Sequence, residues 1–174
     1  MENRGTCNKF MNRIINKLRF NFSATFFLLG LLLFNSCDRA RIFEQNQNIA
    51  EGGWNSKTIL KYDVDITDPA TPANFYINVR NADGYPYNNL YLFIKTTFPN
   101  GKMSNDTLEC VLADEKGKWL GSGMGDIYDN QIPFKRNVRF PLPGKYTFEI
   151  QHGMRTDIVP LIMDIGLRIE KGEK

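Results

Sequence analysis

The sequence predicts an all-β fold, a single antiparallel β-sandwich of the immunoglobulin-like type with about seven strands. Two observations predict it: apolar and polar residues alternate in short runs between residues 58 and 170, and turn-forming sequences separate these runs. No segment in that range has the apolar period of an amphipathic helix. A closed barrel is the alternative architecture.

The first two strands are predicted from strict alternation. Residues 60–67 form a half-buried strand whose apolar face comprises Leu60, Tyr62, Val64 and Ile66. After a break at Asp68–Pro72, a second strand spans residues 75–80, with Phe75, Ile77 and Val79 on one face. We expect these two strands to pair.

The later strands differ in character. Residues 90–98 are apolar on both faces, as expected of a mid-sheet strand that is covered on both sides. Pro99-Asn100-Gly101 predicts a hairpin turn, because Asn-Gly accepts positive φ, and leads to a more polar edge strand at 107–112. A Gly-rich irregular segment at 114–130 precedes strands at 137–140, 145–151 and 162–170.

The first 36 residues have the order of features of a bacterial signal peptide. Basic residues between Arg4 and Arg19 precede an apolar run from Phe22 to Phe34. This run has 13 residues, whereas a helix needs about 20 to cross a bilayer. We therefore expect residues 1–36 to be an export signal and not a permanent transmembrane anchor.

Cys37 follows at once, and residues 33–37 (LFNSC) resemble a lipobox, in which a small residue precedes the cysteine that is acylated. Acyl chains on Cys37 would hold the protein at a membrane by burying methylene groups at about 0.8 kcal/mol each. Soluble secretion, or a cysteine placed there by chance, is the alternative. The polar residues 37–53 are then expected to be a flexible tether, and residues 54–174 the folded domain.

The charge distribution argues against nucleic acid as a partner. Residues 1–36 contain five basic residues and one acidic residue, so this segment carries a net charge of +4, while the whole chain carries a net charge of +3. The remainder is therefore slightly acidic and has no basic excess for a polyanion.

Residues suited to catalysis are few. His152 is the only histidine, and beside Gln151 and Gly153 we expect it on the exposed polar surface. Cys110 and His152 could be imagined as nucleophile and base, but Cys110 alternates in phase with Leu108 and Leu112, which suits a small buried hydrophobe. The sequence therefore predicts no enzyme, no cofactor and no small-molecule substrate.

The loop at 121–130 has two alternative interpretations as a ligand site, and neither is favoured. Gly121-Ser122-Gly123-Met124-Gly125 lacks the spacing and the lysine of a phosphate-binding loop. Asp126, Asp129 and Asn130 could offer oxygen atoms to calcium, but their spacing is not that of an EF-hand. We expect a surface loop and no metal site.

Two aromatic patches are the best candidates for a binding surface. Tyr85-Pro86-Tyr87 lies in a predicted turn, where its rings would either contact a partner or fold back to cap the core. The second patch combines Trp119 with Asp126, Tyr128 and Asp129 in a loop longer than a simple strand connection requires. Trp119 tucked over the sandwich edge is the alternative there.

Several ordered blocks carry a family resemblance: FYINVRN at 75–81, YPYNNLYLF at 85–93, GKWLG at 117–121, GDIYDN at 125–130, NVRFP at 137–141 and PGKY at 143–146. With these blocks and its lipobox, the chain resembles the GldH family of gliding-motility lipoproteins. The resemblance implies a lipoprotein of the outer membrane that acts with other gliding lipoproteins and with the type IX secretion and motility machinery. It implies no catalytic residues.

Two functions from different classes remain open at this point. The first is a non-enzymatic envelope component that binds other proteins, and the second is a carbohydrate-binding lipoprotein module. A carbohydrate module should present a flat row of coplanar aromatic rings, whereas a protein-binding sandwich should present an apolar patch with a polar rim.

Overall fold

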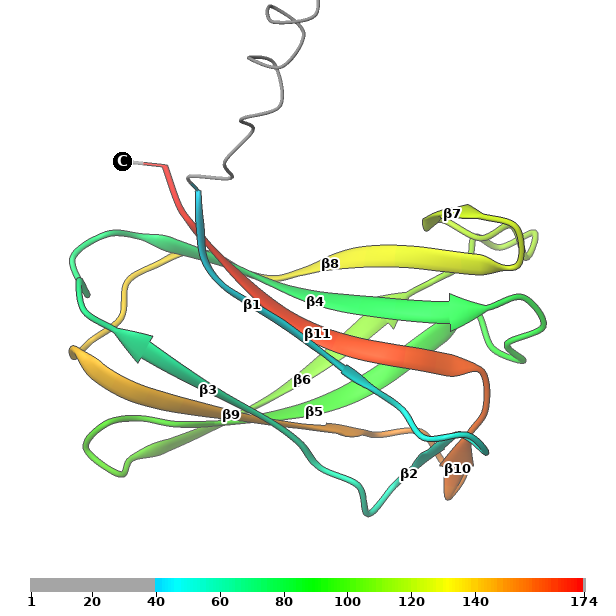
Figure 1. Ribbon diagram of the computed structural model, residues 1–174, viewed down its shortest axis with the longest axis horizontal. Coiled ribbons are helices and arrows are strands. Elements are labelled where there is room, and N and C mark those ends of the chain that lie inside the picture. The colour runs from blue at the N-terminus through cyan, green and yellow to red at the C-terminus, as the bar shows by residue number, and fades with distance from the viewer. Residues whose placement is uncertain (1–39, 174) are drawn as a thin grey trace, which may run out of the picture. The chain divides into compact units, whose positions relative to one another are not determined.

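The computed structural model describes residues 40–173, which form a two-layer antiparallel β-sandwich and confirm the predicted fold class (Figure 1). One layer has the strand order β1 (Arg41–Asn48), β11 (Ile162–Lys171), β4 (Ala73–Ala82), β8 (Ile127–Val138) and β7 (Ser122–Met124). The other has the order β3 (Leu60–Ile66), β9 (Gly144–His152), β5 (Asn89–Thr97) and β6 (Met103–Val111). A ribbon of β10 (Ile158–Val159) and β2 (Trp54–Asn55) completes the described strands. No helix of the described part is long and apolar enough to cross a membrane.

The core lies between the two layers and is built by alternation. Every second residue of β3 is buried, as predicted, and the same pattern recurs in β4 and β9. Burial of each large apolar side chain stabilises the fold by about 1.5–3 kcal/mol. The two layers are also joined by a hydrogen bond, since the Tyr62 hydroxyl donates to the Ile165 carbonyl at 2.7 Å.

Strand β5 lies inside its sheet, between β9 and β6, as its sequence predicts. Its outer face is not covered, however, because the Phe93 side chain is 51% exposed and Tyr91 is also exposed. The predicted turn is confirmed: Gly101 adopts a φ of 79° between β5 and β6, and β6 is an edge strand. The apolar residues on both faces therefore correctly predicted a strand inside the sheet. They incorrectly predicted that a second layer covers its outer face.

The expected pairing of the first two alternating strands is wrong. Strand β3 pairs with β9, while β4 lies in the other layer between β11 and β8. The connection at 67–72 carries the chain from one layer to the other, and Asp68 stabilises its turn by accepting hydrogen bonds from the Ala70 amide and the Thr71 hydroxyl. Alternation specifies which face of a strand is buried, but it does not specify the neighbouring strand.

The segment expected as a flexible tether contains β1, which pairs with β11 along its length. Its composition is polar because β1 is an edge strand with one face in solvent. Among the described residues of this segment, Phe43 and Ile49 are the apolar side chains that pack against the core. The ordered domain therefore begins before residue 54, which corrects the boundary expected from composition.

Strand β8 was also missed in part. It begins within the segment expected to be irregular and continues into the strand expected at 137–140. Pro133 lacks an amide donor, and it pairs with Tyr76 beside a register shift in the β4–β8 ladder. Because a proline lies within a polar sequence here, the sequence pattern did not indicate β8, the longest strand of the described chain.

Candidate functional site

Four rings from two connections and the start of one strand meet at one end of the sandwich. Tyr85 and Tyr87 come from the β4–β5 connection, Trp119 from the β6–β7 connection, and Tyr128 from the start of β8. The ring centroids of Tyr85 and Tyr87 are 5.6 Å apart, those of Tyr85 and Trp119 are 6.3 Å apart, and those of Trp119 and Tyr128 are 5.6 Å apart. We call these four residues the aromatic cluster, which unites the two patches identified in the sequence.

Hydrogen bonds fix the aromatic cluster on the fold. The Trp119 indole Nε1 donates to Asp83 Oδ1 at 2.9 Å, and the Tyr85 hydroxyl donates to the Asn89 carbonyl at 3.0 Å. The Asp83 amide in turn donates to the Asp126 carbonyl at 2.6 Å, which ties the β4–β5 connection to the β7–β8 turn. These hydrogen bonds hold the Trp119 and Tyr85 rings, and the other two rings pack against them.

The members of the aromatic cluster differ in exposure. Tyr85 is only 4% exposed, and burial raises the pKa of its hydroxyl. It folds back to cap the core, as one of the two alternatives proposed. The other three rings are half-buried, and Leu120, which follows Trp119 in the chain, is 58% exposed. Ile127 is also exposed, but it lies on the opposite face of β8 from Tyr128. The accessible surface therefore comprises parts of three rings and the neighbouring Leu120.

The two acidic residues of the predicted site are separated from each other. Asp126 is exposed in the β7–β8 turn, next to the aromatic cluster. Asp129 lies on the outer face of β8, where its Oδ1 accepts a hydrogen bond from Arg80 Nε at 2.6 Å. Because successive side chains of a strand point to opposite faces, Asp129 and Tyr128 do not share a surface.

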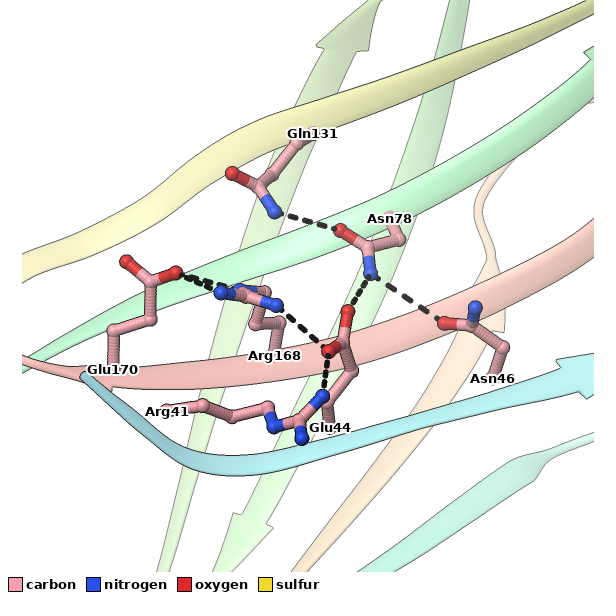
Figure 2. Close-up of polar contacts among 7 residues, drawn as sticks. All are labelled: Arg41, Glu44, Asn46, Asn78, Gln131, Arg168 and Glu170. Atoms are coloured by element: carbon pink, nitrogen blue, oxygen red, sulfur yellow. Dashed lines mark hydrogen bonds and ion pairs between the residues drawn. The ribbon is translucent and has the colours of Figure 1, made fainter. Parts of the chain in front are cut away.

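The outer face of the five-stranded sheet has a polar network that sequence reasoning did not identify. Figure 2 shows Arg168 between Glu44 and Glu170, with Nη1 2.7 Å from Glu44 Oε2 and Nε 2.6 Å from Glu170 Oε1. Asn78 Nδ2 lies 3.4 Å from both Glu44 Oε1 and Asn46 Oδ1, and Gln131 Nε2 lies 3.5 Å from Asn78 Oδ1. Alternation along β4 indicates that Asn78 points outward, but only strand register brings these residues together.

His152 is buried, which corrects the expectation that it lies on the polar surface. Its side chain is 2% exposed, and its ring lies 5.4 Å from that of Trp54 in an edge arrangement. Within the described chain neither ring nitrogen makes a hydrogen bond of normal geometry. Burial lowers the pKa of His152 and favours the neutral ring, while the nearby backbone groups of Trp54 and Asp157 partly oppose this effect. The alternation of β9, with Tyr146, Phe148 and Ile150 buried, was the signal that could have found this position.

Cys110 is a buried free thiol in β6, as predicted from its phase. Burial raises its pKa to about 12, which opposes formation of the thiolate that a nucleophile needs. Among residues 40–173 no group of three or more His, Cys, Asp or Glu side chains is placed to hold a metal ion. The predicted signal peptide and the lipidation site Cys37 lie outside the described residues.

Comparisons with known proteins agree with the resemblance of the sequence blocks. The model of the GldH lipoprotein family matches residues 41–169. The chain is 36% identical to a gliding motility lipoprotein GldH homolog of Christiangramia forsetii, over 90% of this chain and 99% of that protein. It is 30% identical to the gliding motility lipoprotein GldH of Flavobacterium johnsoniae, over 88% of this chain and 99% of that protein.

Among solved structures, a chain of the infectious bursal disease virus Gt strain is similar over 78% of this chain and 34% of its own length, with a TM-score of 0.30 and 14% identity. The family model matches well over half of the chain, and the two relatives match 90% and 88% of it. The chain therefore belongs to the GldH family of gliding-motility lipoproteins.

Proposed function

We propose that this protein is a non-enzymatic, lipid-anchored component of the outer membrane that binds another envelope protein of the gliding-motility machinery through its aromatic cluster. The observation that supports this most is the convergence of rings from two connections and the start of β8 at a single end of the sandwich. Tyr and Trp side chains contribute much of the binding energy at protein interfaces, especially when their surroundings hold them rigid.

The position of the aromatic cluster suits an anchored protein. The start of β1 and the end of β11 lie together, at the end of the sandwich opposite β7 (Figure 1), and the Lys171 amide donates to the Ala40 carbonyl at 2.7 Å. At the other end of β11, Ile162 pairs with Asn81, which in turn pairs with Tyr128. Ten residues of β11 span about 33 Å at 3.3 Å per residue. With Cys37 acylated, the aromatic cluster would lie at the far end of the domain from its anchor.

The alternative function, carbohydrate binding by these rings, has less support. Sugar rings stack best on a flat, open aromatic platform. The interplanar angles are 73° between Tyr85 and Tyr87, 42° between Tyr85 and Trp119, and 35° between Trp119 and Tyr128. The tilted rings and the exposed Leu120 instead suit the apolar centre of a small protein interface.

The proposal is tested by affinity capture from detergent-solubilised outer membranes, followed by mass spectrometry. Leu120→Glu places a charge on the exposed surface beside Trp119 without changing a buried residue, and we expect it to abolish capture and gliding. Trp119→Ala should have the same effect on capture. Phe93→Ala is the matched control, because Phe93 is an exposed aromatic residue in β5, on the outer face of the four-stranded sheet.

Three further measurements decide the outcome: thermal unfolding, labelled-palmitate incorporation and membrane fractionation. Leu120→Glu and Phe93→Ala should keep the unfolding midpoint of the unmodified protein, whereas Trp119→Ala should lower it, because Trp119 packs against the core. All three variants should keep the acylation and outer-membrane location of the unmodified protein. A Leu120→Glu protein that is folded, acylated and still captures the same partners would exclude the aromatic cluster as the binding surface.

A further inference from the structure

A groove of about 350 Å³ lies on the outer face of the five-stranded sheet. Strand register builds it from rows of residues that are distant in sequence. One row runs across four strands as Asn46, Gly166, Asn78 and Gln131, and the next as Asn48, Asp164, Arg80 and Asp129. We call this feature the polar groove. It is distinct from the aromatic cluster, because Asp129 and Tyr128 point to opposite faces of β8.

Gly166 lies between Asn46 and Asn78 in the register of the sheet, and its φ is not among the positive values that favour glycine. A Cβ atom at this position would lie 1.8 Å from Asn46 Oδ1 and 3.1 Å from Asn78 Cβ. The missing side chain therefore lets Asn46 and Asn78 approach each other across β11. Glycine inside a strand is unfavourable for stability, and one setting in which it occurs is a site where another group approaches closely.

The charges of the polar groove disfavour an anionic ligand. Arg80 is the only basic residue among the described residues that line the groove, and it is neutralised by Asp129 at 2.6 Å and Asp164 at 3.0 Å. Asp164 is 4% exposed, so this ion pair is partly buried and Arg80 is not free to bind a phosphate or sulfate group.

The side-chain amides of the polar groove are held by long contacts, which a ligand could replace. Asn78 Nδ2 lies 3.4 Å from both Asn46 Oδ1 and Glu44 Oε1, and Gln131 Nε2 lies 3.5 Å from Asn78 Oδ1, at the weak limit for a hydrogen bond. Each amide has two donor hydrogens and an acceptor oxygen. Paired donors and acceptors on a fixed surface match neighbouring hydroxyl groups, which both donate and accept. Tyr76, two residues from Asn78 on the same face of β4, is half-buried and offers an apolar ring beside them.

We propose that the polar groove binds a neutral oligosaccharide, with Asn46, Asn78 and Gln131 hydrogen-bonded to its hydroxyl groups and Asp129 and Arg80 at one end. This binding activity is additional to the proposed capture of an envelope protein, and it uses a different surface.

The test uses the mature lipoprotein in detergent, titrated by calorimetry with cellohexaose, laminarihexaose, xylohexaose and mannohexaose. Hexagalacturonate serves as the acidic comparison. We expect at least one neutral hexasaccharide to bind with a dissociation constant below about 1 mM, which is a modest affinity, and hexagalacturonate not to bind. An absence of binding by all four neutral sugars, or binding of hexagalacturonate alone, would overturn the proposal.

Variants assign the binding to the groove. Gln131→Ala changes only an exposed side chain, and combined with Asn78→Ala it should weaken binding by about tenfold or more, as expected for the loss of two hydrogen-bonding groups. Gly166→Ala should have a similar effect, because its methyl group displaces Asn46. Leu120→Glu, in the other surface, should bind the sugar normally. Should Gly166→Ala fail to fold, Gln131→Ala alone decides, and unchanged sugar binding by the folded Gln131→Ala protein would refute the assignment.

Discussion

Acidification from pH 7 to pH 5 should destabilise the protein through one residue, His152. The buried ring makes no hydrogen bond of normal geometry in the described chain, and burial lowers its pKa below the ordinary value of 6.5 against the smaller, opposing effect of the Trp54 and Asp157 backbone groups. In the unfolded chain the ring is solvated and binds a proton near pH 6.5. The unfolded state therefore binds more protons than the folded state below that pH, so stability is present above about pH 6.5 and is lost as the pH falls.

The size of the effect has an upper limit. One pKa unit corresponds to about 1.36 kcal/mol, so protonation between pH 6.5 and pH 5 can lower the free energy of unfolding by at most about 2 kcal/mol. Leucine at this position has no polar atoms to leave unsatisfied, and an unsatisfied buried group costs about 1–3 kcal/mol. We therefore expect His152→Leu to be at least as stable as the unmodified protein at pH 5.

Urea unfolding at pH 7, 6 and 5, followed by tryptophan fluorescence, measures this effect, since Trp54 lies against the His152 ring. The difference between the unmodified protein and His152→Leu isolates the histidine. Carboxylates such as Asp63, whose hydrogen bond from Thr147 and contact with Lys145 lower its pKa, lose their contribution only at lower pH and are common to both proteins. An equal loss of stability from pH 7 to pH 5 in both proteins would refute the role of His152.

Three other outcomes are expected. Leu92→Ala should lower the free energy of unfolding by about 2–5 kcal/mol, whereas Lys145→Ala, on the exposed side of β9, should change it by less than about 0.5 kcal/mol in urea titrations; equal effects would mean that the faces are misassigned. Cys37→Ser should abolish labelled-palmitate incorporation, and globomycin should cause the unprocessed form of the unmodified protein to accumulate; a soluble, unlabelled wild-type protein would contradict lipidation. Arg168→Ala leaves Glu44 and Glu170 without their shared partner and should cost about 1–3 kcal/mol, with faster amide hydrogen exchange in β1; unchanged exchange there would contradict the role of Arg168 in holding β1.

Sequence patterns predicted the strands whose two faces have different environments. Strand β3 alternates strictly because one face meets the core and the other meets solvent, and the Asn100-Gly101 pair marks the turn before β6 because it tolerates positive φ. Strands β1 and β8 were missed for the opposite reason. Their partners β11 and β4 supply the backbone hydrogen bonds that hold them in the sheet, so their own side chains need not form a continuous apolar face.

For the candidate sites as well, the sequence indicated individual residues but not their arrangement in space. Aromatic residues in loops were visible in the sequence as two patches, but nothing local indicated that Trp119 and Tyr85 would stack near each other across more than thirty residues of chain. The polar groove depends entirely on the register of strands that are distant in sequence, because Asn46 and Asn78 face each other only across Gly166. A shift of one residue in β11 would place a side chain between them and point every neighbour to the opposite face.

Because β1 is part of the sheet, an acyl anchor on Cys37 would be joined to the domain by a short connection and not by a long flexible tether. A flexible tether over residues 37–53 would have a root-mean-square span of about 20–25 Å, at 5–6 Å times the square root of its length, and would let the domain turn freely above the bilayer. Because β1 is paired with β11 from Arg41 onward, only the residues between Cys37 and Ala40 separate the predicted lipidation site from the folded sheet, a reach of about 11 Å at full extension. An acyl anchor on Cys37 would thus hold the Ala40 end of the sandwich near the membrane. The aromatic cluster at the opposite end would then be directed toward partners in the adjacent aqueous space, and the polar groove would run along the side of the domain.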